Sequence, residues 1–255
     1  MYLRPIGFVL QTDDTTGVDG EAEGMNTPVL HAQSLTKTFG TTTALAGVDL
    51  IVGRGESVAI MGASGSGKTT LLHVLAGIIA PDTGSVIYSS ATAAPIDVTS
   101  KNERERSRLR RESFGFVFQQ GLLIPELTAI ENIALALMIN GTPRRAALEH
   151  AAGWMASLGL TGMEERRIGE LSGGQAQRVA IARAQVTGAE LVFADEPTGA
   201  LDSQTSGEVM DALLWSTTGQ GRTLLVVTHD SEVAARCSRT VQVRDGHVVS
   251  TEVSA

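Results

Sequence analysis

The chain has 255 residues, of which 42% are hydrophobic and 19% charged, a composition typical of a globular protein with a sizeable core. Its formal net charge of -8 argues against a nucleic-acid-binding surface, and its single cysteine, Cys237, excludes an internal disulfide. No apolar run approaches the roughly 20 residues that a membrane-spanning helix needs, and residues 1–10 lack the pattern of a signal peptide.

Residues 1–26 differ in composition from the rest of the chain. Between residues 11 and 24 the sequence is rich in Asp, Thr, Gly and Glu and has almost no apolar side chains. Such a segment buries too little apolar surface to offset the entropy lost on ordering. We therefore expect a disordered extension at residues 1–26, followed by one folded domain over residues 27–255.

The first half of this domain alternates short strands with turns. Strands are expected at residues 29–35, 46–52, 57–61 and 85–88. A loop carrying Phe39 separates the first two strands, and a helix is expected at residues 70–76. Residues 89–100 have the composition of a loop, and a helix with many charged residues follows at residues 103–112.

Apolar strands and helices then alternate along the second half. Strands are expected at residues 114–119, 190–195, 222–229, 240–243 and 248–250. Helices are expected at residues 130–140, 144–158, 175–186, 203–215 and 231–237. Ser172 and Ser203 stand at N-cap positions. Because buried strands that alternate with helices form a mainly parallel sheet covered on both faces, the sequence predicts an α/β fold.

Residues 62–69, GASGSGKT, lie between an expected strand and an expected helix, the context that a P-loop requires. The glycines let successive backbone N–H groups approach an anion, and the helix adds its unpaired N-terminal donors. Lys68 is expected to reach the terminal phosphates, and the Thr69 hydroxyl to ligate Mg²⁺. A chance glycine-rich turn is the alternative. The expected nucleotide-binding residues of this segment are Gly62, Ala63, Ser64, Gly65, Ser66, Gly67, Lys68, Thr69 and Thr70.

An acidic pair follows the apolar strand at residues 190–195. Asp195 ends this strand, where a carboxylate can hold Mg²⁺ beside Thr69. Glu196 comes next, and a carboxylate there can orient and deprotonate a water that attacks the γ-phosphate. An ordinary strand-to-loop turn is the alternative explanation of this pair.

Residues 171–175, LSGGQ, form another helix start with a serine and two glycines. Such a start is a second site suited to an anion, although the P-loop already provides one. One chain with two such sites predicts that two copies meet head to tail, each motif facing the other copy's nucleotide. A simple capped turn is the alternative. The residues expected to contact the opposite copy's nucleotide are Ser172, Gly173, Gly174 and Gln175.

These motifs resemble those of the ATPase subunits of ABC transporters over residues 28–250. In order they are GASGSGKT at 62–69, FQ at 118–119, LSGGQ at 171–175, LVFADEP at 191–197, ALD at 200–202 and TH at 228–229. The resemblance implies a P-loop NTPase fold with a RecA-like core, an antiparallel β subdomain and a helical subdomain at about residues 120–185. It also implies ATP as ligand and Mg²⁺ as cofactor.

The same resemblance implies roles for single residues. Gln119 matches the Q-loop glutamine, which senses Mg²⁺ and the attacking water and links to a membrane partner. Alignment of the segment FVFQQ favours Gln119 over the adjacent Gln120. Glu196 is the general base, and His229 is the switch histidine that contacts the γ-phosphate. Asp202 is the D-loop acid at the seam of the dimer.

Phe39 matches the aromatic position that stacks on adenine, where the family more often has Tyr. A phenylalanine that only packs within its own loop is the alternative. Ala63 replaces a more frequent Pro and Thr69 a more frequent Ser, and both preserve the chemistry of the P-loop. No catalytic position is missing, so the resemblance implies an active ATPase.

Residues 116–133 and 197–202 resemble a subgroup with macrolide exporters, lipoprotein-release systems and FtsE-like cell-division ATPases. This implies a peripheral subunit at the cytoplasmic face of the membrane, bound to an FtsX/MacB-type permease that exports or extracts a peptide, lipoprotein or drug-like substrate. Three alternatives stay open: an importer's ATPase subunit, a regulatory ATPase of cell division, and a soluble ABC ATPase in DNA repair, chromosome organisation or translation. The net charge and the lack of visible coiled coils or nucleic-acid modules count against the last.

Overall fold

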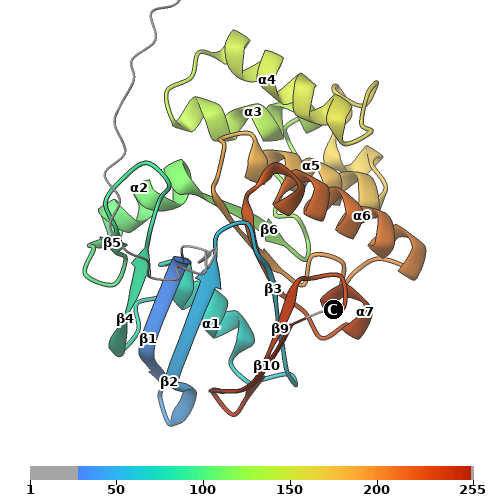
Figure 1. Ribbon diagram of the computed structural model, residues 1–255. Coiled ribbons are helices and arrows are strands. Elements are labelled where there is room, and N and C mark those ends of the chain that lie inside the picture. Colours follow the sequence, from blue (N-terminus) through green and yellow to red (C-terminus); the bar gives the residue numbers. More distant parts are fainter. Residues whose placement is uncertain (1–27, 254–255) are drawn as a thin grey trace, which may run out of the picture.

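The computed structural model of the protein describes residues 28–253 (Figure 1). The disordered extension expected at residues 1–26 lies outside them. The strands are β1 (Pro28–Phe39), β2 (Thr42–Gly53), β3 (Ser57–Met61), β4 (Thr83–Tyr88), β5 (Ile96–Asp97), β6 (Phe114–Phe118), β7 (Leu191–Asp195), β8 (Thr223–Val227), β9 (Arg239–Arg244) and β10 (His247–Val253). The helices are α1 (Lys68–Leu75), α2 (Glu103–Ser113), α3 (Ala129–Ile139), α4 (Arg144–Ser157), α5 (Gly173–Gln185), α6 (Ser203–Ser216) and α7 (Ser231–Ala234), with 3₁₀ turns at Ile168–Glu170 and Thr218–Gln220.

The larger sheet has the strand order β10-β9-β3-β8-β7-β6. Its five strands from β9 to β6 are mutually parallel, and β10 pairs antiparallel with β9. Val58 and Ile60 of β3 belong to one apolar cluster, whereas Ala59 belongs to another. Since successive side chains of a strand point to opposite faces, this sheet is buried on both sides. Its polar chemistry is therefore confined to the strand ends.

The smaller sheet has the order β2-β1-β4-β5 and is antiparallel throughout. Helix α1 packs between the two sheets, where Leu71, Leu72 and Leu75 are fully buried. Helices α5, α6 and α7 cover the opposite face of the larger sheet, and α3 and α4 pack beyond α5 at the upper end of Figure 1. The α/β class and the antiparallel subdomain are confirmed, while the limits of the helical subdomain, 120–185, stay a prediction.

Four local expectations were wrong in detail. Phe39 ends β1 instead of lying in a loop, because Gly40, at φ +60°, closes a tight turn and Phe39 pairs with Thr42. The N-cap of α6 is Asp202 rather than Ser203, since the Asp202 carboxylate accepts the Thr205 N–H at 3.0 Å. The expected helix at residues 231–237 ends at Ala234. A short strand, β5, also lies inside the predicted loop at 89–100.

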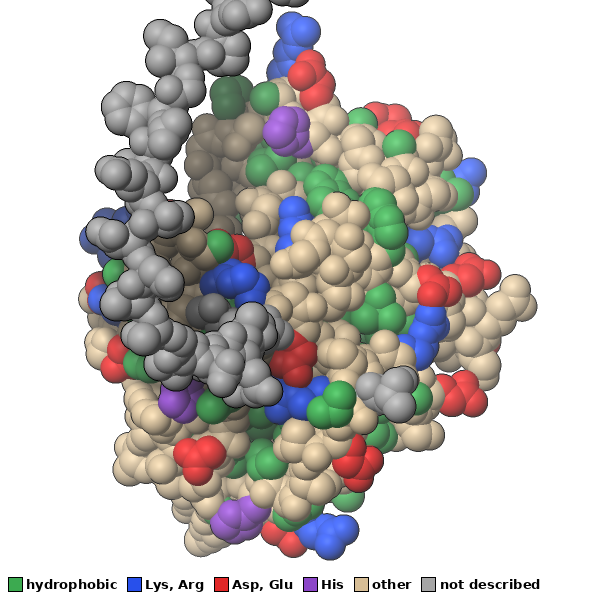
Figure 2. Space-filling model, in the orientation of Figure 1, with side chains coloured by type: hydrophobic (Ala, Val, Ile, Leu, Met, Phe, Trp, Pro, Cys, Tyr) green, Lys and Arg blue, Asp and Glu red, His purple; other side chains and the backbone are tan. Residues whose placement is uncertain are grey.

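Within residues 28–253, no helix is both long and apolar enough to cross a bilayer. On the face in view in Figure 2, the Lys and Arg side chains of the described residues are interspersed with Asp and Glu. Such mixed charge is typical of a globular surface.

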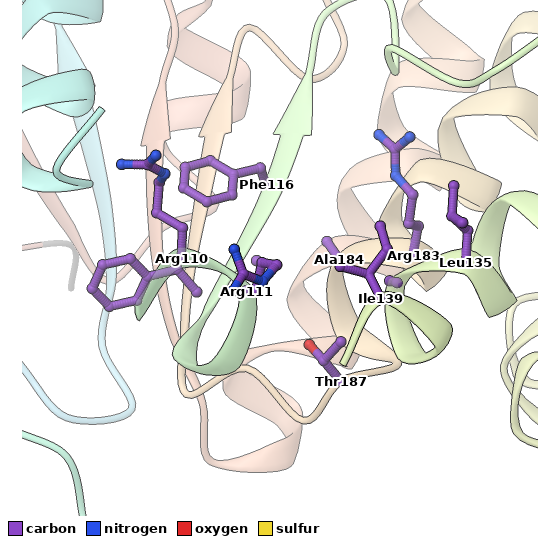
Figure 3. A pocket seen from close by; sticks show the side chains of 11 residues that line it. Arg110, Arg111, Phe116, Leu135, Ile139, Arg183, Ala184 and Thr187 are labelled. Carbon is purple, nitrogen blue, oxygen red and sulfur yellow. The ribbon is translucent and has the colours of Figure 1, made fainter. Parts of the chain in front are cut away.

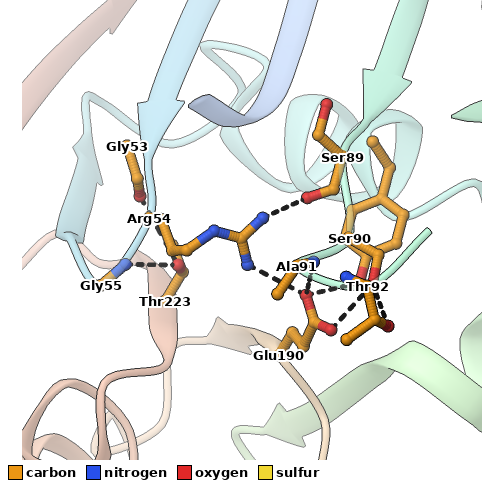
Figure 4. A network of polar contacts seen from close by, with 10 residues as sticks. Gly53, Arg54, Gly55, Ser89, Ser90, Ala91, Thr92, Glu190 and Thr223 are labelled. Carbon is orange, nitrogen blue, oxygen red and sulfur yellow. Dashed lines mark hydrogen bonds and ion pairs between the residues drawn. The ribbon is translucent and has the colours of Figure 1, made fainter. Parts of the chain in front are cut away.

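A carboxylate joins the two sheets at the edge opposite the P-loop (Figure 4). Glu190, which precedes β7, accepts hydrogen bonds from Arg54 Nη1 and the Ala91 N–H at 3.0 Å and from Ser90 Oγ at 2.9 Å. Arg54 also donates to the Ser89 carbonyl at 2.6 Å. Burial would raise the pKa of Glu190, but these hydrogen bonds outweigh it and hold the pKa below its ordinary value. The ionised carboxylate therefore stabilises the fold.

Glu190→Gln is expected to lower the free energy of unfolding by about 1–3 kcal/mol at pH 7, because it removes charge-assisted hydrogen bonds. The difference in free energy of unfolding between variant and parent is fully present at pH values above the ordinary carboxyl pKa. It disappears as the pH falls through the lower pKa that Glu190 has in the folded protein. Urea denaturation at several pH values measures it. Glu149→Gln, which removes an exposed partner of Arg145, serves as the control and is expected to unfold like the parent. Equal stability of Glu190→Gln and parent at pH 7 would contradict the assignment.

Candidate active site

The predicted site residues meet at one edge of the larger sheet. Gly62 follows β3, His229 follows β8, Glu196 follows β7 and Gln119 follows β6, and these four strands are neighbours in the sheet. Because the strands are parallel, their carboxyl ends lie at the same edge, where open α/β sheets bind ligands. Segments as far apart in sequence as residues 62 and 229 thus share one site.

Two glycines make the tight path of the P-loop possible. A Cβ on Gly62 (φ +154°) would lie 2.1 Å from the Val243 carbonyl oxygen. A Cβ on Gly67 (φ +103°) would lie 2.2 Å from the Ala44 carbonyl oxygen. Since side chains cannot approach backbone oxygens so closely, only glycine fits at either position.

The P-loop ends in a helix start that lacks a side-chain cap. Helix α1 begins at Lys68, its N-cap Gly67 has no side chain, and its first turn holds no acidic residue. The first N–H groups of the helix have no intrahelical acceptor, so they are suited to bind an anion. Lys68 Nζ donates to the carbonyls of Gly62 and Ala63, both at 2.8 Å, which holds its ammonium inside the loop. The buried hydroxyl of Ser66 has no hydrogen-bond partner among the described residues.

A cavity of about 560 Å³ lies against this loop, large enough for a nucleotide. Glu196 and His229 close one side of it, and Thr42 and Ala44 of β2 line another. These two β2 residues were not predicted from the sequence, because neither has a side chain whose chemistry marks a site. The P-loop residues that line the cavity are Gly62, Ala63, Ser64, Gly65, Gly67, Lys68, Thr69 and Thr70.

Thr69 and Asp195 lie together, with the Thr69 hydroxyl donating to Asp195 Oδ1 at 3.3 Å. Burial raises the pKa of Asp195, and the hydrogen bond from Thr69 only partly offsets this. A half-buried carboxylate beside a hydroxyl fits Mg²⁺, which takes one or two protein oxygens and completes its shell with phosphate and water. Residues 28–253 hold no group of three or more His, Cys, Asp and Glu side chains that could hold a metal ion.

Glu196 and His229 form a direct pair, with His229 Nδ1 2.9 Å from Glu196 Oε1. Glu196 has a φ of +48°, which is strained for a side chain of this size, and its N–H donates to the Val227 carbonyl at 2.9 Å. The hydrogen bond and the charge of Glu196 raise the pKa of His229 above its ordinary value. The carboxylate is therefore held at the cavity by a partner that also lines it.

Gln119 lies in a second cavity, of about 320 Å³, next to the first. This cavity is also lined by Thr69, Asp195 and Glu196. The Gln119 amide packs on Gly199, where an added Cβ would lie 3.0 Å from its Nε2. Gln120 lines the same cavity, so the choice between the two glutamines stays a prediction.

The LSGGQ segment forms the predicted helix start. The Ser172 hydroxyl accepts the Gln175 N–H at 3.3 Å, and Gln175 Oε1 accepts the Ser172 N–H at 2.9 Å, which completes a capping box. Ser172 and Gly173 are exposed, whereas Gly174 packs so closely on Thr205 of α6 that a Cβ would clash. Among the described residues that line the P-loop cavity, none belongs to 172–175.

Phe39 and Asp202, like Ser66 and residues 172–175, do not line the P-loop cavity. Phe39 is 48% exposed, and Lys37 Nζ lies 5.5 Å from the centre of its ring. The Lys37 ammonium therefore makes a cation–π contact with this ring at the end of β1. The pairing of Phe39 with Thr42, which does line the cavity, keeps it near the site. The carboxylate of Asp202 is used to cap α6. Stacking on adenine and a dimer contact stay predictions for these residues.

A family model described as ABC transporter matches residues 45–199. The chain is 42% identical over 231 residues to the pyoverdine export ATP-binding/permease protein PvdT of Pseudomonas fluorescens, covering 89% of this chain and 34% of that one. It is 40% identical over 232 residues to the macrolide export ATP-binding/permease protein MacB of Nitrosomonas europaea, with the same coverage. The chain thus spans about a third of the length of these relatives.

Two solved structures share the fold. The ATP-binding cassette MJ0796, in a dimeric post-hydrolysis state bound to ADP and Pi, has a TM-score of 0.79 and 35% identity, over 89% of this chain and 99% of that one. CbiO1 from Clostridium perfringens, part of the ABC transporter complex CbiONQ, has a TM-score of 0.78 and 26% identity, over 89% of each chain. The site residues lie at the carboxyl ends of the parallel strands, and the sheet that holds them has the fold of these solved structures. The chain therefore belongs to the ABC transporter family and has the fold of its ATPase domains.

Proposed function

We propose that the chain binds and hydrolyses Mg·ATP between two of its copies and thereby drives an integral membrane permease for export. The observation that carries this proposal is the cavity that the P-loop shares with the Glu196–His229 pair, together with Asp195, which accepts a hydrogen bond from Thr69 in the adjoining cavity. The exporter names of the relatives favour export over import. The domain from residue 27 to 255, with its helical subdomain at about 120–185, forms this ATPase at the cytoplasmic face of the membrane.

The chain's own residues provide each part of the reaction. The P-loop amides and Lys68 bind and orient the phosphates, with Lys68 turning from the loop carbonyls to the terminal phosphates. Thr69, Asp195 and Gln119 would hold Mg²⁺, which neutralises charge on the phosphates when bound. Glu196 accepts the proton of the attacking water, and His229 keeps its carboxylate turned to the cavity while contacting the γ-phosphate.

The capped helix start at Ser172 lies outside the chain's own P-loop cavity, which supports a site completed by a second copy. In a head-to-tail dimer, Ser172 to Gln175 of each copy reach the nucleotide of the other, and Asp202 lies at the seam. Loss of the γ-phosphate removes the shared anion, so the dimer opens. A closing and opening dimer is a source of mechanical work on a permease.

A groove of about 300 Å³ gives the permease a place to dock. It lies between the end of α2 and the start of β6 on one side and α3 and α5 on the other, and Figure 3 shows side chains standing on both sides of it. Its lining is mainly apolar and carries Arg110, Arg111 and Arg183, while Ile139 at its rim is 59% exposed. Apolar surface with arginine at its edges is the composition of protein interfaces.

Replacing the proposed general base tests the chemistry. Glu196→Gln is expected to lower the turnover number by about 100-fold or more, because the amide cannot accept a proton. Its affinity for ATP should stay close to that of the parent, and the protein should accumulate as an ATP-bound dimer in analytical ultracentrifugation. Lys68→Ala, by contrast, should lose ATP binding. Normal hydrolysis by Glu196→Gln would refute the role of Glu196.

Mixing two inactive variants tests the shared site. Lys68→Ala removes the P-loop charge, and Ser172→Asp keeps the N-cap while placing a negative charge where the phosphate should lie. Each variant alone should be inactive. In an equal mixture, half of the random dimers contain one intact composite site, so about a quarter of the parental turnover should return. Ser172→Asn, which keeps the cap without the charge, is the control. No recovery on mixing would argue against a head-to-tail site.

Site-specific crosslinking tests the permease. A photoreactive residue at Ile139, in the groove, is expected to crosslink in native membranes to a protein with membrane-spanning helices, identified by mass spectrometry. The same residue at Ile51, which is 55% exposed on β2 away from the groove, is the matched control. Equal crosslinking from both positions, or none to a membrane protein from Ile139, would contradict docking in the groove.

A further inference from the structure

The turn that carries Gln119 is anchored by side chains of α3 and α5. Gln177 Nε2 donates to the Phe118 carbonyl at 2.9 Å, before Gln119. Arg183 Nη2 donates to the Gly121 carbonyl at 2.6 Å, and its Nη1 to the Leu122 carbonyl at 2.8 Å, both after Gln119. The chain between residues 118 and 122 is therefore held at both ends by one helix, α5.

A further anchor fixes the next part of the loop. Asn132 of α3, which is 1% exposed, accepts the Ile124 N–H at 2.8 Å through Oδ1 and donates to the Ile124 carbonyl at 3.1 Å through Nδ2. This anchor is independent of Arg183, because it comes from another helix and binds another residue. The loop thus contains two segments that can be loosened separately.

The segment held by Arg183 has a backbone that needs support. Gly121 has a φ of +66° and Leu122 a φ of +46°, and the left-handed conformation costs free energy for a branched side chain such as leucine. The Leu122 side chain is 59% exposed, so burial of its own side chain does little to compensate. The two carbonyls bound by Arg183 belong to these two residues. A planar guanidinium, with donors in a fixed fork, holds both carbonyls at once in one relative orientation, whereas an ammonium turns freely at the end of a flexible stem.

Arg183 is half-buried between the loop and the groove of Figure 3. Burial lowers its pKa, yet a guanidinium keeps its charge at any physiological pH. The charge is compensated by the two carbonyl oxygens, and both hydrogen bonds are charge-assisted. The turn and the guanidinium therefore depend on each other.

We propose that Arg183 is a positioning residue for hydrolysis, which holds the turn at Gly121 and Leu122 and thereby keeps Gln119 at the cavity shared with Thr69, Asp195 and Glu196. It does not touch the reacting atoms. The inference rests on the proposed function through the role of Gln119, and the test below separates the two.

Hydrogen exchange of the full chain measures how readily the turn opens, and the measurement does not depend on ATPase activity. The Gly121 N–H donates to the Phe118 carbonyl at 2.8 Å, and Arg183→Met is expected to speed its exchange by about 10-fold, whereas the Ile124 amide, held by Asn132, should exchange as in the parent. Arg178→Met removes an arginine from the same helix, but one that pairs with Glu208 on α6, and it should leave exchange of the Gly121 amide unchanged. Unchanged exchange of the Gly121 amide in Arg183→Met would overturn the proposal.

Steady-state kinetics then separate positioning from general stability. Arg183→Met is expected to lower kcat by about 10- to 100-fold with the KM for ATP changed less than about twofold, since only the placement of Gln119 is lost. Arg183→Lys, which keeps the charge but not the fork, should lie between parent and Arg183→Met. The double variant Arg183→Met/Gln119→Ala should be no slower than Gln119→Ala alone.

Each contrary result has a distinct meaning. Additive losses in the double variant, or a parental kcat in Arg183→Met despite faster exchange, would overturn the positioning role of Arg183. Full activity of Gln119→Ala would overturn the role of Gln119 in the proposed function, and with it the route by which Arg183 acts. An inactive parent with the expected exchange pattern would refute the ATPase proposal and keep only the anchoring of the turn.

Discussion

The site depends on a parallel sheet that is apolar on both faces. In β3, Val58 and Ile60 pack toward α1 and Ala59 toward the helices of the opposite face, so the strand has no solvated side. Polar groups are then satisfied most easily at the strand ends, and parallel pairing brings the carboxyl ends to one edge. The P-loop, Asp195, Glu196 and His229 meet there because burial places their strands side by side. The hydrophobic effect that forms the sheet thus also assembles the polar site.

This origin explains which parts of the molecule were predictable from sequence. The strands and most helices were predictable from apolar periodicity. The P-loop was predictable from its glycine pattern, and the structure explains that pattern at Gly62 and Gly67, where any Cβ would clash. The cap of α6 was placed one residue late, because Asp202 and Ser203 are both good N-caps and only the backbone conformation selects between them. Phe39 was assigned to a loop because the hairpin's tight turn at Gly40 was not recognised.

The contacts that the sequence did not predict are tertiary and lack a local pattern. Thr42 and Ala44 line the cavity only because β2 passes beside the P-loop, with the Ala44 carbonyl close to Gly67. Arg183 reads as an ordinary polar position of a helix until the loop after β6 is placed against it. Residues of this kind bind backbone carbonyls. Because every residue has a backbone carbonyl, the type of the bound residue does not indicate the contact. A single sequence therefore reveals the groups that do chemistry better than those that hold them.

Helix α5 has two ends with different tasks. At its start, the capping box uses the N–H groups of Ser172 and Gln175, and the N–H groups of Gly173 and Gly174 precede the first intrahelical hydrogen bond. The capping box holds this start in its helical conformation, so binding an anion there requires little further ordering. Near its other end, the same rigid helix holds the turn that carries Gln119. One helix therefore provides both a start suited to an anion and the anchor of the turn that carries Gln119.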